Sequence, residues 1–166
     1  MIPTVRRTGA LCALLILPLL FCEHAAAQNA ADAAALAEYR LTDDGLAKFS
    51  QATRNLGAAV AADPGLEERM DKKSRDDATI AETAAIYDSE PAVRKAVEDA
   101  DLTSSEYVTF VYSLAQAAMG AWSMQQYGED KLPAGTPREN VDFYLANSDK
   151  IAALSKEMQA LDKNDD

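Results

Sequence analysis

Apolar side chains at helical spacing predict a first long helix over residues 43–61. Thr42 before it is a suitable N-cap, because its hydroxyl can accept from a free backbone N–H of the first turn. Asp63-Pro64-Gly65 is a turn-forming sequence, at which we expect the helix to end. The large apolar positions follow one another in steps of three, seven and four residues, which places them on one face: Leu46, Phe49, Leu56 and Val60.

Shorter helices are predicted in the segment that follows. Ser74 with Asp77 resembles a helix-start signal. Pro91 is tolerated in a first turn, so it is expected to begin a further helix that ends near Asp99. Between these two starts, three residues are spaced as the buried side of a short helix: Ile80, Ala84 and Tyr87.

The strongest pattern predicts a second long helix over residues 104–127. Thr103-Ser104-Ser105-Glu106 has the form of a capping box, and no charged side chain occurs in residues 107–128. A helix that is apolar most of the way round is either the centre of a bundle or a membrane span. Six polar side chains oppose a span, so we expect a dry central helix and no membrane span: Thr109, Ser113, Gln116, Ser123, Gln125 and Gln126.

A second capping box, Thr136-Pro137-Arg138-Glu139, predicts a last long helix over residues 137–161. Asn147 lies on its apolar seam. The simpler interpretation is a partly exposed Asn or a local break, and the alternative is a buried amide that fixes helix register or contacts a ligand. The seam follows alternating steps of three and four residues, typical of nearly antiparallel packing: Tyr144, Ile151, Leu154, Met158 and Leu161.

These patterns predict an all-α fold, an antiparallel helical bundle with one domain over residues 41–162. Residues 28–40 are expected to be a flexible Ala-rich lead-in, because Leu36 is the one large apolar side chain before Tyr39. Residues 163–166 are expected to be an acidic tail. Two or three short helices are expected between the first and second of three long helices, which span residues 43–61, 104–127 and 137–161.

The first 27 residues have the layout of a removable secretory signal. Arg6 and Arg7 precede an almost wholly apolar stretch of 14 residues, which is shorter than the roughly 20 that a spanning helix needs. Three small residues, Ala25-Ala26-Ala27, then precede Gln28. We therefore expect cleavage after Ala27 and a periplasmic or secreted protein. An uncleaved N-terminal anchor and a lipid anchor through Cys22 are the alternatives.

Charge and reactive side chains narrow the class of function. Removal of the signal leaves 14 basic and 26 acidic side chains, a formal charge of −12, which repels nucleic acid and anionic lipid surfaces. No nucleic-acid partner is expected. His24, Cys12 and Cys22 are the only His and Cys residues, and all lie in the signal. The mature chain therefore lacks disulfides, thiolate or imidazole metal ligands, and His-based nucleophile pairs.

No metal site, cofactor site or catalytic residue is expected, and the chain is not expected to be an enzyme. Alternating oxygen side chains from Asp99 to Ser105 resemble the start of an EF-hand loop. However, Ser104 stands where that loop needs Gly, and Phe110 stands where it needs Glu. The glycines form no phosphate-binding loop. A carboxylate-dependent hydrolase would require two acids that face each other across a cleft.

Four side chains are candidates for contact with a ligand or partner: Tyr107, Trp122, Tyr144 and Asn147. Tyr and Trp combine an apolar body with a polar tip, which suits them to a cleft or an interface. The simpler interpretation is that the aromatic residues pack in the core. We expect a non-catalytic protein-binding or interaction module of the cell envelope. The alternative is a carrier or sensor of a small apolar ligand held between helices 104–127 and 137–161.

Two short segments resemble a known group of proteins. Asp101-Leu102-Thr103-Ser104-Ser105-Glu106-Tyr107 enters an Ala-rich helix, and Asn140-Val141-Asp142-Phe143-Tyr144 opens the last one. Together they resemble small exported all-helical proteins of Gram-negative bacteria that have no assigned function. The resemblance covers about residues 41–155. It implies a helical fold and export, and it carries no functional residue to this chain.

Overall fold

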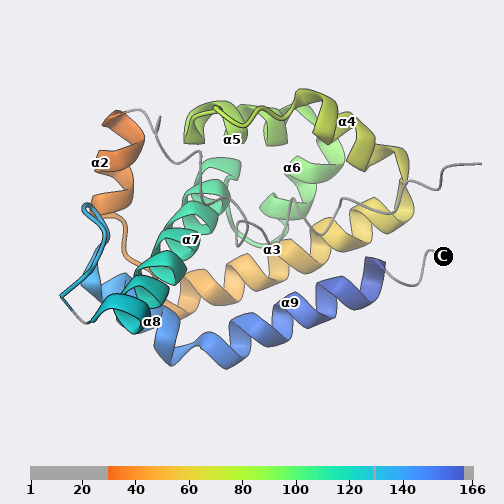
Figure 1. Cartoon of the computed structure of the whole chain (residues 1–166). Coiled ribbons are helices and arrows are strands. Elements are labelled where there is room, and N and C mark those ends of the chain that lie inside the picture. Colours follow the sequence, from red (N-terminus) through yellow and green to blue (C-terminus); the bar gives the residue numbers. More distant parts are fainter. Residues whose placement is uncertain (1–29, 129, 163–166) are drawn as a thin grey trace, which may run out of the picture.

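The computed structural model describes residues 30–128 and 130–162, and this part of the chain is all-helical with no strand (Figure 1). The expected signal peptide, residues 1–27, and the expected acidic tail, residues 163–166, lie outside the described residues. The helices are α2 (Ala30–Glu38), α3 (Asp43–Ala62), α4 (Gly65–Lys73), α5 (Ile80–Ser89), α6 (Pro91–Glu98), α7 (Ser104–Tyr127), α8 (Arg138–Ala146) and α9 (Ser148–Asp162).

Three helix starts lie where the sequence predicts them, those of α3, α6 and α7. Thr42 Oγ1 accepts from the Gly45 N–H at 3.1 Å and caps α3. Thr103 and Glu106 form the expected capping box of α7, and Gly128, with φ of 108°, ends that helix. Pro91 is the first residue of α6. The long helices α3 and α7 are therefore confirmed.

Two expected capping signals are wrong. Ser74 is the C-cap of α4, and α5 begins instead with a capping box of Thr79 and Glu82. Thr136 does not cap α8, because that helix begins at Arg138 with Pro137 as its N-cap. The Thr136 hydroxyl is buried with no hydrogen-bond partner in the structure. In both places the helix starts later along the chain than the sequence indicates.

The Ala-rich stretch is packed rather than a lead-in outside the fold. Residues 30–38 form α2, and Leu36 is 0% exposed in the core. Asp32 Oδ2 accepts from the Ile80 N–H of α5 at 3.1 Å. One buried leucine and one carboxylate are thus sufficient to dock this short helix on the rest of the molecule.

The last expected long helix is two helices, because the chain breaks at Asn147 between α8 and α9. Asn147 is 7% exposed, so the expected local break is confirmed and the expected partial exposure is wrong. Its Nδ2 donates to the Phe143 carbonyl at 3.1 Å, and Lys150 Nζ donates to its Oδ1 at 2.8 Å. Both bonds stay within the α8–α9 corner.

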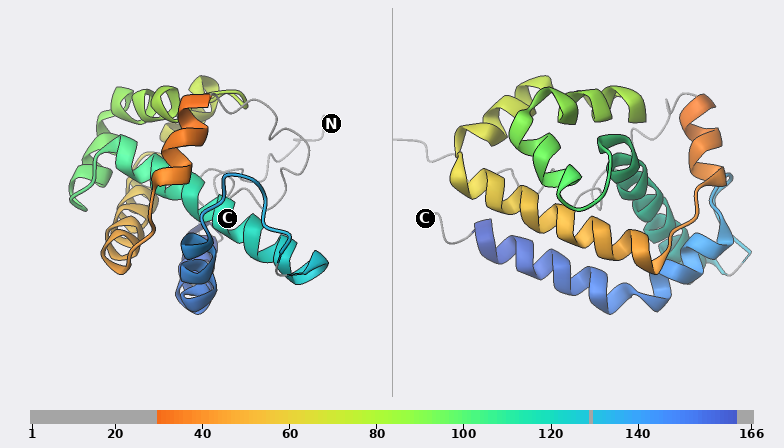
Figure 2. Two further views of the ribbon diagram at one scale, coloured as in Figure 1. Left: turned by 90° about the vertical axis from the view of Figure 1, so that its left-hand side faces the viewer. Right: turned by 180° about the vertical axis from the view of Figure 1, so that it is seen from behind.

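Neighbouring helices pair differently from a bundle of three long helices. α7 packs mainly on α5 and α8, while α3 packs on α6 and, to a smaller extent, on α9 (Figures 1 and 2). The core between these pairs is aromatic. The Phe49 ring of α3 stacks on Tyr107 and Phe110 of α7, with centroids 5.3 and 4.9 Å apart, and Tyr87 of α5 lies 5.7 Å from Tyr107. The short helices therefore complete the core.

Candidate protein-binding surface

Helix α7 has a buried first half and an exposed end. Tyr107, Val108 and Phe110 are at most 2% exposed. Further along, Met119 is 44%, Trp122 52% and Tyr127 66% exposed. We refer to these last three side chains as the α7 patch. The expectation that the whole neutral stretch is shielded is therefore wrong for its second half, which reaches beyond the neighbouring helices (Figure 2, left).

The cause of this exposure is that only one side of the α7 end is covered. A Cβ added at Gly120 would lie 2.8 Å from Val141 Cγ2 and 3.0 Å from Leu132 Cδ1, so α8 and the loop before it press closely on that side. Trp122 comes two residues later, which at 3.6 residues per turn directs it to nearly the opposite side. No other described helix packs there extensively, since α3 and α5 contact the first half.

The α7 patch has a defined local geometry. The Trp122 and Tyr127 rings meet edge to face, with centroids 5.7 Å apart and an interplanar angle of 85°. Such a pair is favourable beyond simple burial and presents a rigid apolar surface. A shallow, open depression of about 450 Å³ adjoins the patch, lined by Ser123, Tyr127, Asp130, Lys131, Leu132 and Pro133. It is open to solvent along most of its boundary, so it does not enclose a small ligand.

The loop beside the patch is attached to α7. Ser123 Oγ donates to the Lys131 carbonyl at 2.6 Å. Two turns earlier in α7, Gln116 Nε2 lies 3.4 Å from the Gly135 carbonyl, a long hydrogen bond. These two contacts hold the loop against α7 on the side away from Trp122. The loop therefore leaves the patch open.

The structure does not bring the four candidate contact residues together. Tyr107 lies in the core, and its hydroxyl is 3.3 Å from Thr53 Oγ1. Tyr144 is half-buried against the core, and Asn147 is buried at the α8–α9 corner. Only Trp122 is presented to solvent. Its neighbours Met119 and Tyr127 were not singled out by the sequence, because the pattern predicts a fully shielded helix.

The buried tyrosines are held in their neutral form. Burial raises the pKa of Tyr87 to about 12, and burial likewise raises the pKa of Tyr107. A neutral phenol in an apolar core is a packing group and a hydrogen-bond partner, and it has no access to substrate. These two residues therefore act structurally.

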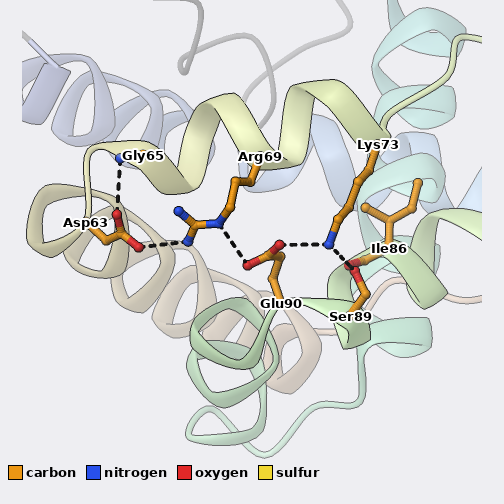
Figure 3. A network of polar contacts seen from close by, with 7 residues as sticks. All are labelled: Asp63, Gly65, Arg69, Lys73, Ile86, Ser89 and Glu90. Atoms are coloured by element: carbon orange, nitrogen blue, oxygen red, sulfur yellow. Dashed lines mark hydrogen bonds and ion pairs between the residues drawn. The ribbon is translucent and has the colours of Figure 1, made fainter.

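Glu90 is engaged in a polar network between helices (Figure 3). Glu90, at the α5–α6 junction, accepts from Lys73 at 2.7 Å and from Arg69 at 3.4 Å. Arg69 also donates to Asp63 at 2.7 Å, and Lys73 donates to Ser89 at 2.9 Å. The network joins α4 to the end of α3 and to the α5–α6 junction.

This network changes the acidity of its two carboxyl groups. The hydrogen bond from Lys73 lowers the pKa of Glu90, and the hydrogen bond from Arg69 lowers the pKa of Asp63. Both groups are therefore held ionised, which is the reverse of what a general acid needs. Sequence spacing could not identify this network, because its two bases lie on α4, whereas its two acids lie at the end of α3 and at the α5–α6 junction.

Within residues 30–128 and 130–162, no three His, Cys, Asp or Glu side chains gather where they could hold a metal ion. No helix in these ranges combines the length and apolar content needed to cross a membrane. Comparisons with protein-family models, with curated proteins and with solved structures found no match to this chain.

Proposed function

We propose that this chain is a non-catalytic protein-binding module that contacts its partner through the α7 patch. The supporting observation is that three large side chains within nine residues of one helix are each more than two-fifths exposed. Single exposed apolar residues are common, whereas grouped ones mark interaction surfaces. Trp, Tyr and Met are also enriched at protein–protein interfaces, where Trp and Tyr often provide most of the binding energy.

The lack of charge on this helix supports the same proposal. Residues 107–128 carry no ionisable acid or base other than tyrosine, in a chain with a formal net charge of −11. Burial of the α7 patch by a partner would therefore desolvate no charged group of α7, and this avoids the penalty of several kcal/mol that burial of an ion carries. An uncharged surface on a strongly charged molecule is therefore suited to contact with another protein.

Export to the periplasm or beyond is part of the proposal. The basic start, the apolar stretch and the small residues before Gln28 support it, as does the resemblance to small exported helical proteins. N-terminal sequencing of the protein from fractionated cells is the test. A first residue at Gln28 is expected, whereas a blocked N-terminus at Cys22 would show a lipid anchor and an intact Met1 in the envelope fraction would show an uncleaved anchor. An intact Met1 in the cytoplasmic fraction would contradict export.

A carrier of a small apolar ligand between α7 and the helices after it is the weaker alternative. The half-buried Tyr144 favours it, but the close approach of Gly120 to Val141 leaves no space for a ligand at that level. A native mass spectrum of the protein purified from its own cells decides this point. A bound mass that disappears on denaturation would favour the carrier over the binding module.

Photo-crosslinking tests the binding proposal directly. A photoreactive benzoylphenylalanine is placed at position 122 in one variant and at position 85 in a matched control, since Ala85 is exposed on α5. Irradiation of the producing cells is expected to give a discrete adduct from position 122 and none from position 85. Equal labelling from positions 122 and 85 would contradict the proposal. The absence of any adduct from position 122, and from further variants with the probe at position 119 or 127, would also contradict it.

A further inference from the structure

We infer that the partner of the α7 patch is a second copy of this chain, with α7 packed on α7 across a two-fold axis. The inference rests on the proposed function and adds the identity of the partner. It depends on the distribution of charge, on the shape of the exposed face of α7, and on the area that this face offers.

Charge favours a neutral partner at this position. The chain has 27 acidic and 16 basic residues, so two copies repel each other at long range. Contact through a charged face would add short-range repulsion or bury unpaired charges. Residues 107–128 form the longest uncharged stretch of the sequence, so contact through α7 brings neutral surface against neutral surface. A basic partner would instead gain most from the acidic faces of the other helices.

The exposed face of α7 has the form of a helix-packing surface. Its members are spaced at i, i+3, i+4, i+7 and i+11, which places them on one stripe. We call this the α7 stripe: Ala115, Ala118, Met119, Trp122 and Gln126. Ala115 and Ala118 are small and half-buried, so a second helix can approach closely there. Met119 and Trp122 are exposed and can fill the space on either side of the crossing point.

A two-fold axis follows from this arrangement. In such an isologous contact the same residues serve on both sides, so Ala115 and Ala118 of one copy meet the same two residues of the other at the crossing point, and Met119 and Trp122 pack beside them. The stripe lies on the side of α7 opposite Gly120, which α8 covers. A second copy can therefore dock without displacing any described element.

The extent of the stripe predicts a weak dimer. Eleven residue steps of a helix measure about 17 Å, so the stripe is a short contact surface. A standard stable interface is larger and covers roughly 800 Å² on each partner. A helix pair of this length is at the small end of specific interfaces, so association is expected to depend on concentration. Salt should strengthen it, because salt screens the repulsion between two acidic chains. Binding of a basic protein would show the opposite salt dependence.

Sedimentation equilibrium of the purified mature chain tests the inference, over roughly 5 μM to 1 mM protein. The expected result is a rise of the average mass from one copy towards two, with a larger dimer fraction at about 300 mM than at about 20 mM salt. Trp122→Lys and Met119→Lys are each expected to reduce the dimer fraction at least tenfold. Ala85→Lys, which makes the same charge change on α5, should leave dimerisation unchanged.

The outcomes separate this inference from the proposed function. A chain that stays monomeric throughout, or a dimer that Trp122→Lys does not weaken, overturns the inference. If such a monomer still forms an adduct from position 122 that contains another protein, the proposed function stands and only the identity of the partner is wrong. An adduct composed of peptides of this chain alone supports both. A monomer that gives no adduct at all refutes both.

Discussion

Asn140 of α8 holds the backbone of Leu41, which lies 99 residues earlier in the chain. Its Oδ1 accepts from the Leu41 N–H at 2.9 Å, and its Nδ2 donates to the Tyr39 carbonyl at 3.0 Å. Asn140 is 1% exposed, so this amide satisfies two backbone groups where water has little access. The α2–α3 connection is thereby fixed to α8.

Asn140→Ala is therefore expected to lower the free energy of unfolding by about 1–3 kcal/mol, because it leaves the buried Leu41 N–H without its partner, while the part-buried Tyr39 carbonyl keeps the hydrogen bond from Arg40. Urea denaturation monitored by circular dichroism measures the change. Asp142→Ala is the control on the same helix, since it removes only an exposed ion pair with Arg138 and should cost about 0.5 kcal/mol or less. Equal effects of the two substitutions would contradict the role assigned to Asn140.

Gly120→Ala is expected to destabilise the protein even though alanine favours helices. The new Cβ would lie 2.8 Å from Val141 Cγ2, and the β-branched Val141 cannot turn away freely. Overpacking typically outweighs the gain in helix propensity, so we expect a net loss of about 1–2 kcal/mol.

The double variant Gly120→Ala, Val141→Ala separates the clash from other causes. Removal of the valine methyl groups should relieve the clash, so the double variant should lose at least about 1 kcal/mol less than the sum of the two single losses. Strictly additive losses in thermal or urea unfolding would show that Gly120 is needed for another reason.

Acidification is expected to weaken the network around Glu90. The pKa values of Glu90 and Asp63 are lowered in the folded state, so their stabilisation is complete at neutral pH. It is lost as the pH falls below the ordinary glutamate value of 4.5 towards the lower folded value, because the unfolded chain then binds more protons. Glu90→Gln should be less stable than the parent at neutral pH and should lose less stability on acidification.

Unfolding free energies measured between about pH 3 and pH 7 check this expectation. Other carboxyl groups of the protein, such as those of the two capping boxes, keep a part of the acid sensitivity in the variant. Glu139→Gln, on the exposed side of α8, is the matched control. Parallel stability curves for the parent and Glu90→Gln would refute the role of the network.

Trp122 provides a direct optical measurement of the α7 patch, because it is the only tryptophan in the chain. At low protein concentration its emission should resemble that of tryptophan in water and should be readily quenched by acrylamide, since the side chain is 52% exposed. At high concentration a shift to shorter wavelength is expected as the second copy covers it. An emission maximum that is already blue-shifted in the dilute protein would contradict the exposed position.

Local sequence signals explain which parts of the fold could be predicted. Thr42 and Thr103 each satisfy N–H groups within their own first turn, so neighbouring residues are enough to identify them. Thr136 has the same signal, but the adjacent Pro137 becomes the N-cap and the hydroxyl is left unused. Ser74 was the expected start of α5, but Thr79, which has Glu82 at the third helical position, forms the capping box.

Contacts between distant segments explain what could not be predicted. The docking of α2 depends on Leu36 and on the bond from Ile80 to Asp32, which no local pattern indicates. The exposure of Trp122 depends on which helices reach the end of α7, and a hydrophobic pattern shows only that the residue is apolar. Trp122 is the one residue shared by the four candidates and the α7 patch, and it was chosen for its side-chain chemistry and not for its exposure.

The corner at Asn147 determines which helices pack against the end of α7. α8 runs beside α7, and after the corner α9 runs beside α3, where Arg54 pairs with Glu157 at 2.9 Å. A single straight helix of the same length could have packed along only one of the two helices, α7 or α3. Because the chain turns at Asn147, α8 packs on α7 and α9 packs on α3. The side of the α7 end opposite Gly120 therefore stays exposed to solvent and can contact another molecule.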